Sequence, residues 1–294
     1  MTTHRTALTV AHIAAVLFGL TGIFGALIHA DATVITFGRA AFAVAALAIF
    51  ALLQKRPLLR GLNGYKLGLL ALTGLLLATH WVTFFIAVKV GGVAVATLGF
   101  ASFPAFIALL DMLVFRERIG GPEGMLLALV TLGLVLVTPS FDFGDQGTVG
   151  LLWGVGSGLS FALLAMANRR GARGMDAMQV AFWQNVVVAL VVAPFAAGKL
   201  GAPQQMDWFY LALLGVFCTG LSQYLFVKSL EGLNARSAGM IIALEPVYAI
   251  ACAWWLFAEQ PSLRMLAGAA LIIFAIVLSA RGKPTPSMKQ TAVA

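Results

Sequence analysis

Charged residues are scarce in this chain of 294 residues, and their scarcity excludes most classes of soluble protein. Only 10% of the residues are Asp, Glu, Lys or Arg, whereas 61% are hydrophobic and the mean hydropathy is +0.97. A soluble domain carries about 25% charged residues. The chain is therefore too apolar for a soluble domain of this length, and we expect an integral membrane protein.

The sequence also lacks the patterns that support catalysis, metal binding or nucleotide hydrolysis. It has no cluster of His, Cys and carboxylates at metal-ligand spacing, and no glycine-rich loop followed by Lys-Ser or Lys-Thr. The only cysteines, Cys218 and Cys252, lie in apolar segments and are expected to pack as small hydrophobic residues. We therefore expect no catalytic residues, no metal and no cofactor. An ATP-driven pump is excluded too, since the chain has no room for a nucleotide-binding domain.

Long apolar runs, in contrast, are abundant. A membrane-spanning helix needs roughly 20 mostly apolar residues. The runs are continuous and do not alternate with polar residues, which excludes a strand-built barrel and predicts an all-α integral membrane fold. Ten transmembrane helices are predicted, at residues 9–29, 33–53, 66–88, 93–115, 123–140, 148–168, 176–197, 208–229, 235–257 and 263–281.

Basic residues are distributed unevenly between the predicted loops. With the N-terminus placed inside, fifteen Lys and Arg residues fall on the inner side, whereas the other side receives only Lys89, Lys199 and Arg264. The positive-inside rule then places both termini in the cytoplasm, in a multi-pass protein of the bacterial cytoplasmic (inner) membrane. The formal net charge of +8 is explained by orientation and lipid contact, so nucleic acid is not an expected partner.

One pattern occurs twice: a proline in the fourth span of each half is followed thirteen residues later by a glutamate. Pro104 precedes Glu117, and Pro246 precedes Glu259. This predicts two five-helix units, residues 1–141 and 142–282, followed by a disordered cytoplasmic tail at 283–294. Because each unit has an odd number of spans, the second must enter the membrane from the opposite face. The result is an inverted repeat, a plan that recurs in secondary transporters.

Ten spans in two repeats, the paired prolines and glutamates, and an arginine early in the second span resemble the drug/metabolite transporter superfamily. Within it, the chain is most similar to EamA-type ten-helix exporters, in particular YddG-like amino-acid exporters. The resemblance covers about residues 8–281. It implies a central pathway lined by spans 1–4 and 6–9, with spans 5 and 10 outside. The second repeat has Gln184 where the first has Arg39, so any role of that arginine belongs to one half only.

Three ionisable residues lie well inside predicted spans, away from the span ends, where a charge is costly and is a functional candidate by default. His80 is expected to contact substrate or to bond a neighbouring helix. Glu245 is a candidate proton-coupling acid, an anchor for a substrate ammonium, or a partner of Arg39, with a structural ion pair as the alternative to all three. Arg39 is able to hold a substrate carboxylate, but we favour a structural or gating role for it.

The other candidates are aromatic or neutral polar residues on the predicted lining helices, and glycines and prolines that permit bending. As a group they favour a pocket for zwitterionic or uncharged solutes with apolar side chains, although packing explains each one singly. The substrate-binding candidates are His80, Trp81, Phe84, Phe100, Ser102, Trp183, Gln184, Asn185, Gln223, Tyr224, Glu245 and Tyr248, and the gating or structural candidates are Gly22, Arg39, Pro104, Gly158 and Pro246.

The sequence thus predicts a secondary transporter that exports small metabolites, foremost amino acids including aromatic and other neutral ones, by alternating access. Its partners are a small-molecule substrate and the lipid bilayer; proton coupling and the oligomeric state are left open. One alternative is an exporter of the same type with other cargo, namely drugs or toxic cations, nucleotide-type metabolites or sugars. A second is an intramembrane enzyme or a membrane assembly protein that transports nothing.

Overall fold

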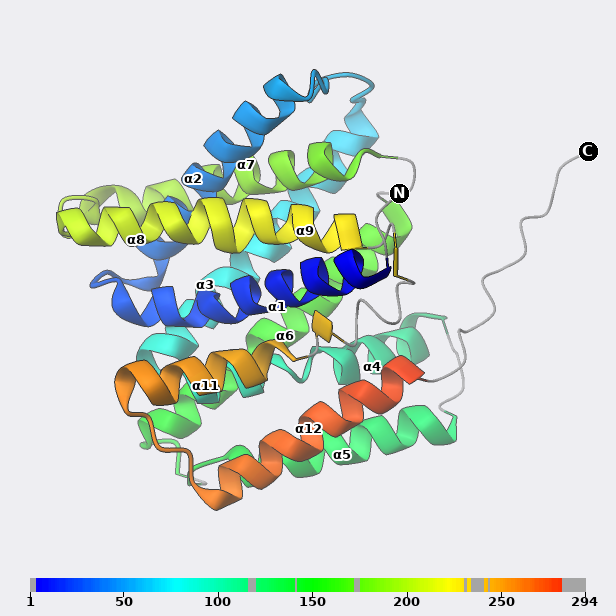
Figure 1. Ribbon diagram of the computed structural model, residues 1–294, viewed down its shortest axis with the longest axis vertical. Helices are drawn as coiled ribbons and strands as arrows, with labels where there is room; N and C mark the ends of the chain where they lie inside the picture. The colour runs from blue at the N-terminus through cyan, green and yellow to red at the C-terminus, as the bar shows by residue number, and fades with distance from the viewer. Residues whose placement is uncertain are drawn as a thin grey trace, which may run out of the picture.

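The computed structural model describes residues 4–115, 120–140, 142–171, 175–229, 232–233, 241–242 and 244–281. In these ranges the chain is helical and contains no strand, and its helices run side by side across the molecule (Figure 1). The helices are α1 (His4–Leu27), α2 (Ala32–Leu53), α3 (Gly64–Phe100), α4 (Phe103–Phe115), α5 (Gly121–Val137), α6 (Gln146–Gly171), α7 (Ala177–Ala196), η1 (Ala197–Lys199), α8 (Gln205–Gly215), η2 (Val216–Leu221), α9 (Ser222–Ser229), α11 (Glu245–Phe257) and α12 (Leu263–Arg281).

The apolar composition of these helices confirms the predicted all-α membrane fold. In the described part of the chain, six helical stretches are long and apolar enough to cross a membrane, and three further apolar helices are shorter. The predicted number of ten spans is therefore not confirmed. The long stretches are His4–Leu27, Ala32–Leu53, Gly64–Phe100, Gln146–Asn168, Ala177–Lys199 and Gln205–Phe226, and the shorter ones are Phe103–Val114, Gly124–Val137 and Leu263–Leu278.

The prediction of one continuous helix over residues 93–115 is wrong. The chain first bends at Gly92 inside α3, where φ of 82° and ψ of 170° suit only glycine. The second arm of α3 ends at Phe100, and α4 starts at Phe103 after a turn. Pro104 thus lies in the first turn of α4, where its missing N–H breaks no hydrogen bond. Pro246 has the same place in α11, so each proline starts a helix instead of bending one.

Helix α6 fills the angle between the two arms of α3. It runs antiparallel to the first arm, where the Ser160 hydroxyl donates to Leu76 O at 2.8 Å. Along the second arm it packs at backbone distance: a Cβ added to Gly154 would lie 2.8 Å from Ala96 O and 3.2 Å from the Gly99 Cα. Small residues thus permit the close helix packing that stabilises membrane proteins.

One glycine contact occurs in both halves. A Cβ added to Gly74 of α3 would lie 3.2 Å from Gln184 O of α7, and one added to Gly215 of α8 would lie 2.6 Å from Arg39 O of α2. Arg39 and Gln184 are the positions that the sequence repeat makes equivalent. The packing of α3 on α7 is therefore repeated by the packing of α8 on α2.

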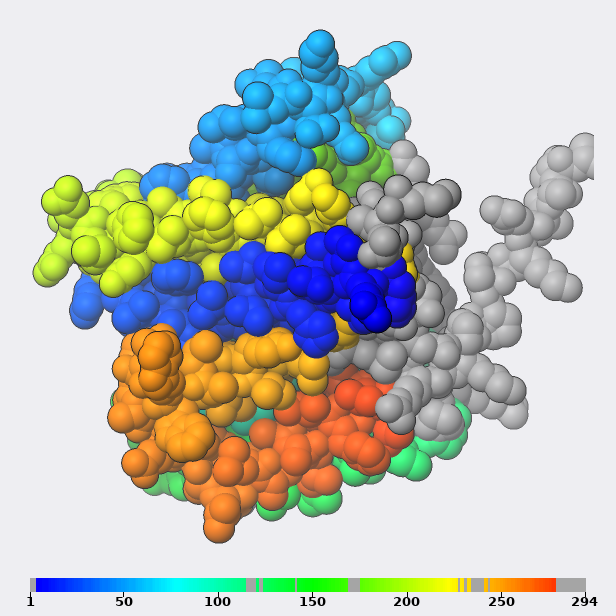
Figure 2. Space-filling view, in the orientation of Figure 1, coloured from blue at the N-terminus to red at the C-terminus, as the bar shows by residue number. Residues whose placement is uncertain are grey.

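The remaining helices complete the bundle. α1 lies between α9 and α11 on the face seen in Figure 2. α5 and α12 pack together at one edge of the molecule (Figure 1), where Gly133 and Gly268 allow the two helices to touch. This position agrees with the peripheral place expected for the fifth and tenth spans, and it leaves the other helices to surround the centre.

Candidate substrate site

Arg39 lies buried at the point where α2, α3 and α8 meet, with only 5% of its surface exposed. Its Nε donates a hydrogen bond of 2.7 Å to Thr219 Oγ1, and its Cζ lies 3.9 Å from the centre of the Trp81 ring. The flat guanidinium therefore stacks on the indole, a favourable cation–π arrangement. One side chain thus joins two helices of the first half to a helix of the second.

A π-helical turn positions Thr219 for this contact. In η2 the Thr219 hydroxyl donates to Leu214 O, five residues back, at 3.1 Å. Gly215 directly precedes the turn and allows α8 to approach the backbone of α2 at Arg39. Single π-helical turns occur frequently at functional sites. Thr219 was not among the predicted residues, because one threonine in an apolar helix gives no signal in the sequence.

The charge of Arg39 is not matched by an adjacent anion in the described part of the chain. Glu245, the first residue of α11, interacts with it electrostatically, but the two side chains do not form an ion pair within 4.0 Å. In the same part of the chain, neither Nη nitrogen of Arg39 donates a hydrogen bond. The direct ion pair between these two residues, one of the alternatives for Glu245, is therefore not formed in this structure.

His80 joins α3 to α6. Its Nδ1 lies 2.7 Å from Ser157 Oγ, and the Ser157 hydroxyl donates to His80 O at 3.0 Å. Nδ1 also lies 3.3 Å from the backbone oxygen of Ser157, which only accepts, so a protonated Nδ1 donates to Ser157. Phe100 and Phe161 enclose the ring, with centroids 5.0 Å and 5.1 Å away. These contacts favour the helix-bonding alternative for His80 over direct substrate contact.

The aromatic candidates of α3 and α4 form one cluster around His80. Phe84 packs edge-on against Phe100, and Phe103 stacks on Phe100 with centroids 5.2 Å apart. Ser102 lies beside this cluster, in the turn before α4, and its hydroxyl donates to Gly99 O. The structure thus brings Phe84, Phe100 and Ser102 together, next to the Arg39–Trp81 pair.

The three polar or aromatic candidates of α7 make local contacts instead. The Trp183 indole N–H donates to Leu58 O in the loop between α2 and α3, and Gln184 Nε2 donates to Asn168 Oδ1. Asn185 Nδ2 donates to Ala181 O, while its buried Oδ1 has no partner within the described part of the chain. These three side chains are therefore engaged around α7 and do not reach Arg39.

The candidates on α9 and α11 lie along α1 and α2. Gln223, one helical turn beyond Thr219, has a buried Oε1 that finds no hydrogen-bond partner in the described ranges. Tyr224 packs edge-on against Phe50 with centroids 5.0 Å apart and is 39% exposed. The Tyr248 hydroxyl lies 2.9 Å from Nδ1 of His12, a residue to which the sequence assigned no role. Of these side chains, only Gln223 shares the helix face that contacts Arg39.

Two candidate glycines mark close helix contacts. A Cβ on Gly22 of α1 would lie 3.0 Å from Cγ1 of Val93, and one on Gly158 of α6 would lie 2.8 Å from the Ser102 hydroxyl. Both positions lie against the second arm of α3 or the turn that follows it. Their packing suits the structural or gating role expected for them.

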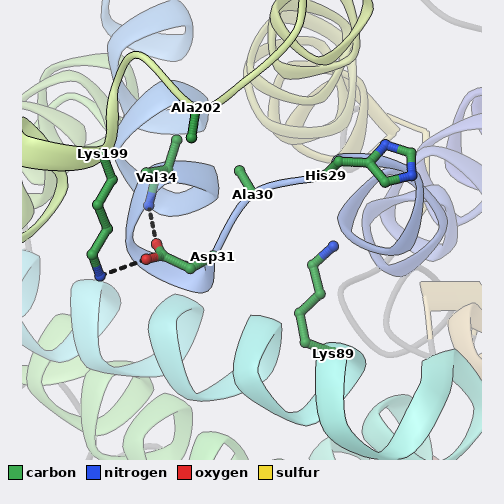
Figure 3. Close-up of a pocket in the computed structure, with 7 residues that line it drawn as sticks. All are labelled: His29, Ala30, Asp31, Val34, Lys89, Lys199 and Ala202. Carbon is green, nitrogen blue, oxygen red and sulfur yellow. Dashed lines mark hydrogen bonds and ion pairs between the residues drawn. The ribbon is translucent and has the colours of Figure 1, made fainter.

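A polar pocket of about 380 Å³ opens at the end of the bundle where α1 meets α2 (Figure 3). Lys199 pairs there with Asp31, and Lys89 donates to Ile28 O. Partial burial alone would raise the pKa of Asp31, but hydrogen bonds from Lys199 and from Thr33 outweigh it and lower the pKa to about 2. The pocket is lined by His29, Ala30, Asp31, Val34, Lys89, Lys199 and Ala202.

Glu259 forms further hydrogen bonds at the same end of the bundle. Its carboxylate accepts from the backbone N–H of Val93 at 3.3 Å and of Ala94 at 3.4 Å, directly after the bend at Gly92. A carboxylate is favourable at a helix N-terminus, where N–H groups lack partners. The glutamate of the second repeat thus caps a helix of the first. Glu117, its counterpart, lies outside the described residues.

Comparison with known proteins places these features in a family. The model of the EamA-like transporter family matches this chain twice, at residues 5–138 and 148–281. An uncharacterized transporter of Archaeoglobus fulgidus is 25% identical over 92% of this chain and 94% of its own length. An S-adenosylmethionine uptake transporter of Rickettsia conorii is 28% identical over 69% of this chain and 68% of its own.

Two further likenesses agree with this assignment. The pseudopaline exporter CntI of Pseudomonas aeruginosa is 25% identical over 82% of this chain and 84% of its own. A crystal structure with 19% identity superposes with a TM-score of 0.65 and covers 94% of this chain and 96% of the other, which shows that the fold is shared. The chain therefore belongs to the EamA-like transporter family of the drug/metabolite transporter superfamily, and it is a multi-pass membrane transporter of small molecules and not an enzyme.

Proposed function

We propose that this transporter exports amino acids, including neutral and aromatic ones, across a bacterial inner membrane. The observation that carries the proposal is the buried pair of Arg39 and Trp81, which lies where the first half meets the second at Thr219. The cluster formed by Phe84 and Phe100 lies beside this pair. A cation next to aromatic walls suits a solute that combines a carboxylate with an apolar side chain.

Alternating access is the mechanism we propose. Two five-helix units, residues 1–141 and 142–282, would form an inverted repeat whose central site opens to one side at a time. The matched contacts of Gly74 and Gly215 support this arrangement, because each fixes equivalent helices in the two units. Both termini would lie in the cytoplasm, as the distribution of basic residues indicates.

The contacts near the polar pocket support closure of the pathway at that end of the bundle. With both termini in the cytoplasm, that end would face outward. Lys89 bonds Ile28 O, and Gly25 packs directly against the Phe85 ring, so the end of α1 lies against α3. Opening of the outer side would separate these groups, together with the Asp31–Lys199 pair. Glu245, which lies near Arg39 at the start of α11, is the residue we propose to test first for proton coupling.

A second candidate cargo follows from the relatives. The Rickettsia proteins are named as uptake transporters of S-adenosylmethionine, whereas the Pseudomonas protein is named as an exporter of pseudopaline. Similarity to both leaves S-adenosylmethionine as the alternative substrate, with uptake as the alternative direction.

Uptake into liposomes that contain the purified protein tests this proposal. Labelled neutral and aromatic amino acids and S-adenosylmethionine would be supplied outside, with and without a pH gradient. We expect amino acids to enter faster than into protein-free liposomes. Entry of S-adenosylmethionine alone would overturn the amino-acid proposal, and acceleration by the gradient that persists in Glu245→Gln would exclude Glu245 as the coupling group.

A further inference from the structure

We infer that Arg39 binds the carboxylate of the transported solute and that Gln223 accepts a hydrogen bond from its ammonium group. This assignment rests on the proposed function and makes it specific, since it names the two groups that select an amino acid. Arg39 would thus serve substrate recognition, in place of the structural or gating role favoured from the sequence.

The first observation is the unused part of the Arg39 side chain. Thr219 accepts from Nε, and Trp81 covers one face of the guanidinium. These contacts fix the plane of the group, while neither Nη nitrogen has a hydrogen-bond partner in the described residues. A guanidinium held in this way presents its nitrogen donors in the planar fork that a carboxylate accepts with both oxygens.

The second observation is the missing anion. A buried cation is costly unless an anion and hydrogen bonds compensate it. Arg39 is 5% exposed, and Glu245 interacts with it only beyond direct ion-pair distance. The carboxylate of a solute would supply the missing charge. Glu245 would keep no direct ion-pair partner in the described residues, and when ionised it would favour a ligand with a nearby ammonium.

The third observation is an acceptor that lacks a donor. Gln223 Oε1 is enclosed and has no hydrogen-bond partner among the residues that the structure describes. It lies four residues after Thr219, which places it one turn further on the helix face that contacts Arg39. A buried acceptor without a partner is destabilising, and an ammonium group would satisfy it. Together the two unmet requirements match an α-amino acid, which carries an ammonium and a carboxylate on one carbon atom.

Binding of a small series of ligands tests the assignment on the unaltered protein. The probes are L-phenylalanine, L-phenylalaninamide, which lacks the carboxylate, and 3-phenylpropanoate, which lacks the ammonium. We expect purified protein to bind L-phenylalanine about 10- to 100-fold more tightly than the amide. Equal affinity for L-phenylalanine and its amide would overturn the carboxylate assignment without any need for a variant.

Variants separate the two groups. In Arg39→Gln the affinity for both L-phenylalanine and 3-phenylpropanoate should fall at least about tenfold. Gln223→Leu should weaken L-phenylalanine binding and leave 3-phenylpropanoate unchanged. Arg56→Gln is the matched control, because Arg56 pairs with Asp176 at the exposed surface. Arg39→Lys retains the charge and replaces Arg39→Gln if the latter does not fold; wild-type affinity in the folded variant would contradict the assignment.

The outcomes also distinguish this inference from the proposed function. Binding of 3-phenylpropanoate that depends on Arg39, without binding of any amino acid, would keep the carboxylate site and overturn amino-acid export. Transport of L-phenylalanine at the same rate by wild type and Arg39→Gln would keep amino-acid transport and overturn the carboxylate site at Arg39.

Discussion

Arg39 and Gln184 occupy equivalent places in the two halves, yet their surroundings differ. Each backbone carbonyl faces a glycine of the opposite half, at Gly215 and Gly74 respectively. The Gln184 side chain bonds Asn168 in its own half, whereas Arg39 reaches across to Thr219. The repeat therefore preserves backbone packing and varies the side chain placed on it. In a transporter built this way, substrate chemistry is expected where the halves differ.

The largest effect should come from filling the shared glycine contact. Gly215→Val places a side chain 2.6 Å from Arg39 O, so α8 and α2 must separate. Overpacking of this kind costs about 1–3 kcal/mol. Gly74→Val should destabilise the protein similarly, but only Gly215→Val should also abolish substrate binding, because it displaces Arg39.

Thermal unfolding in detergent and ligand binding measure these two effects. Gly156→Ala is the control, since a Cβ at Gly156 meets no atom within 4 Å. Equal loss of binding in both valine variants would contradict the prediction that only the half with Arg39 contributes to substrate binding.

Replacing one tryptophan in each half, Trp81 or Trp183, tests the same comparison. Trp81→Leu removes the ring on which Arg39 stacks, while Trp183→Leu removes one hydrogen bond to Leu58 O. A desolvated cation–π contact is worth about 2 kcal/mol. Trp81→Leu should therefore lower the transport rate by roughly 30-fold, and Trp183→Leu should leave it within about twofold of wild type. Liposome uptake checks this, and similar rates for both variants would move Trp81 to a packing role.

A smaller effect separates stability from transport at His80. Ser157→Ala removes the hydroxyl that lies 2.7 Å from His80 Nδ1 and leaves only the backbone oxygen of residue 157, at 3.3 Å, as an acceptor. It should destabilise the protein by about 1 kcal/mol. Substrate affinity should stay unchanged, because the pair joins helices. Unfolding temperature and L-phenylalanine binding report the two properties. A loss of affinity with unchanged stability would instead assign His80 to substrate contact.

The smallest effect concerns the polar pocket. The pKa of Asp31 is about 2 in the folded protein, below its ordinary value of 3.8. Its contribution to stability is therefore present above about pH 4 and is lost as the pH falls toward 2. Asp31→Asn and Lys199→Gln should both reduce the fall in unfolding temperature between pH 5 and pH 2, measured in detergent. A fall as steep as that of wild type would mean that this pair is not responsible.

Much of the fold could be predicted from the sequence, because continuous apolar runs leave helices as the solution in a membrane. The break before Pro104 could not, since a proline inside an apolar run is compatible with either a bent helix or a helix start. At the site, Arg39 stood out as a costly charge in a span, and Trp81 was one of several aromatic candidates. Thr219 did not, because its contact with Arg39 depends on a π-helical turn and on packing between residues 180 positions apart.

Counterflow of labelled L-phenylalanine in liposomes most directly tests the claim that recognition lies where the repeat differs. Wild type, Arg39→Gln and Gln184→Leu would be compared at equal protein content. We predict that Arg39→Gln loses at least about 90% of the wild-type rate, as expected for a lost charge-assisted hydrogen bond, whereas Gln184→Leu retains most of it. Equal rates for Arg39→Gln and wild type would contradict the account.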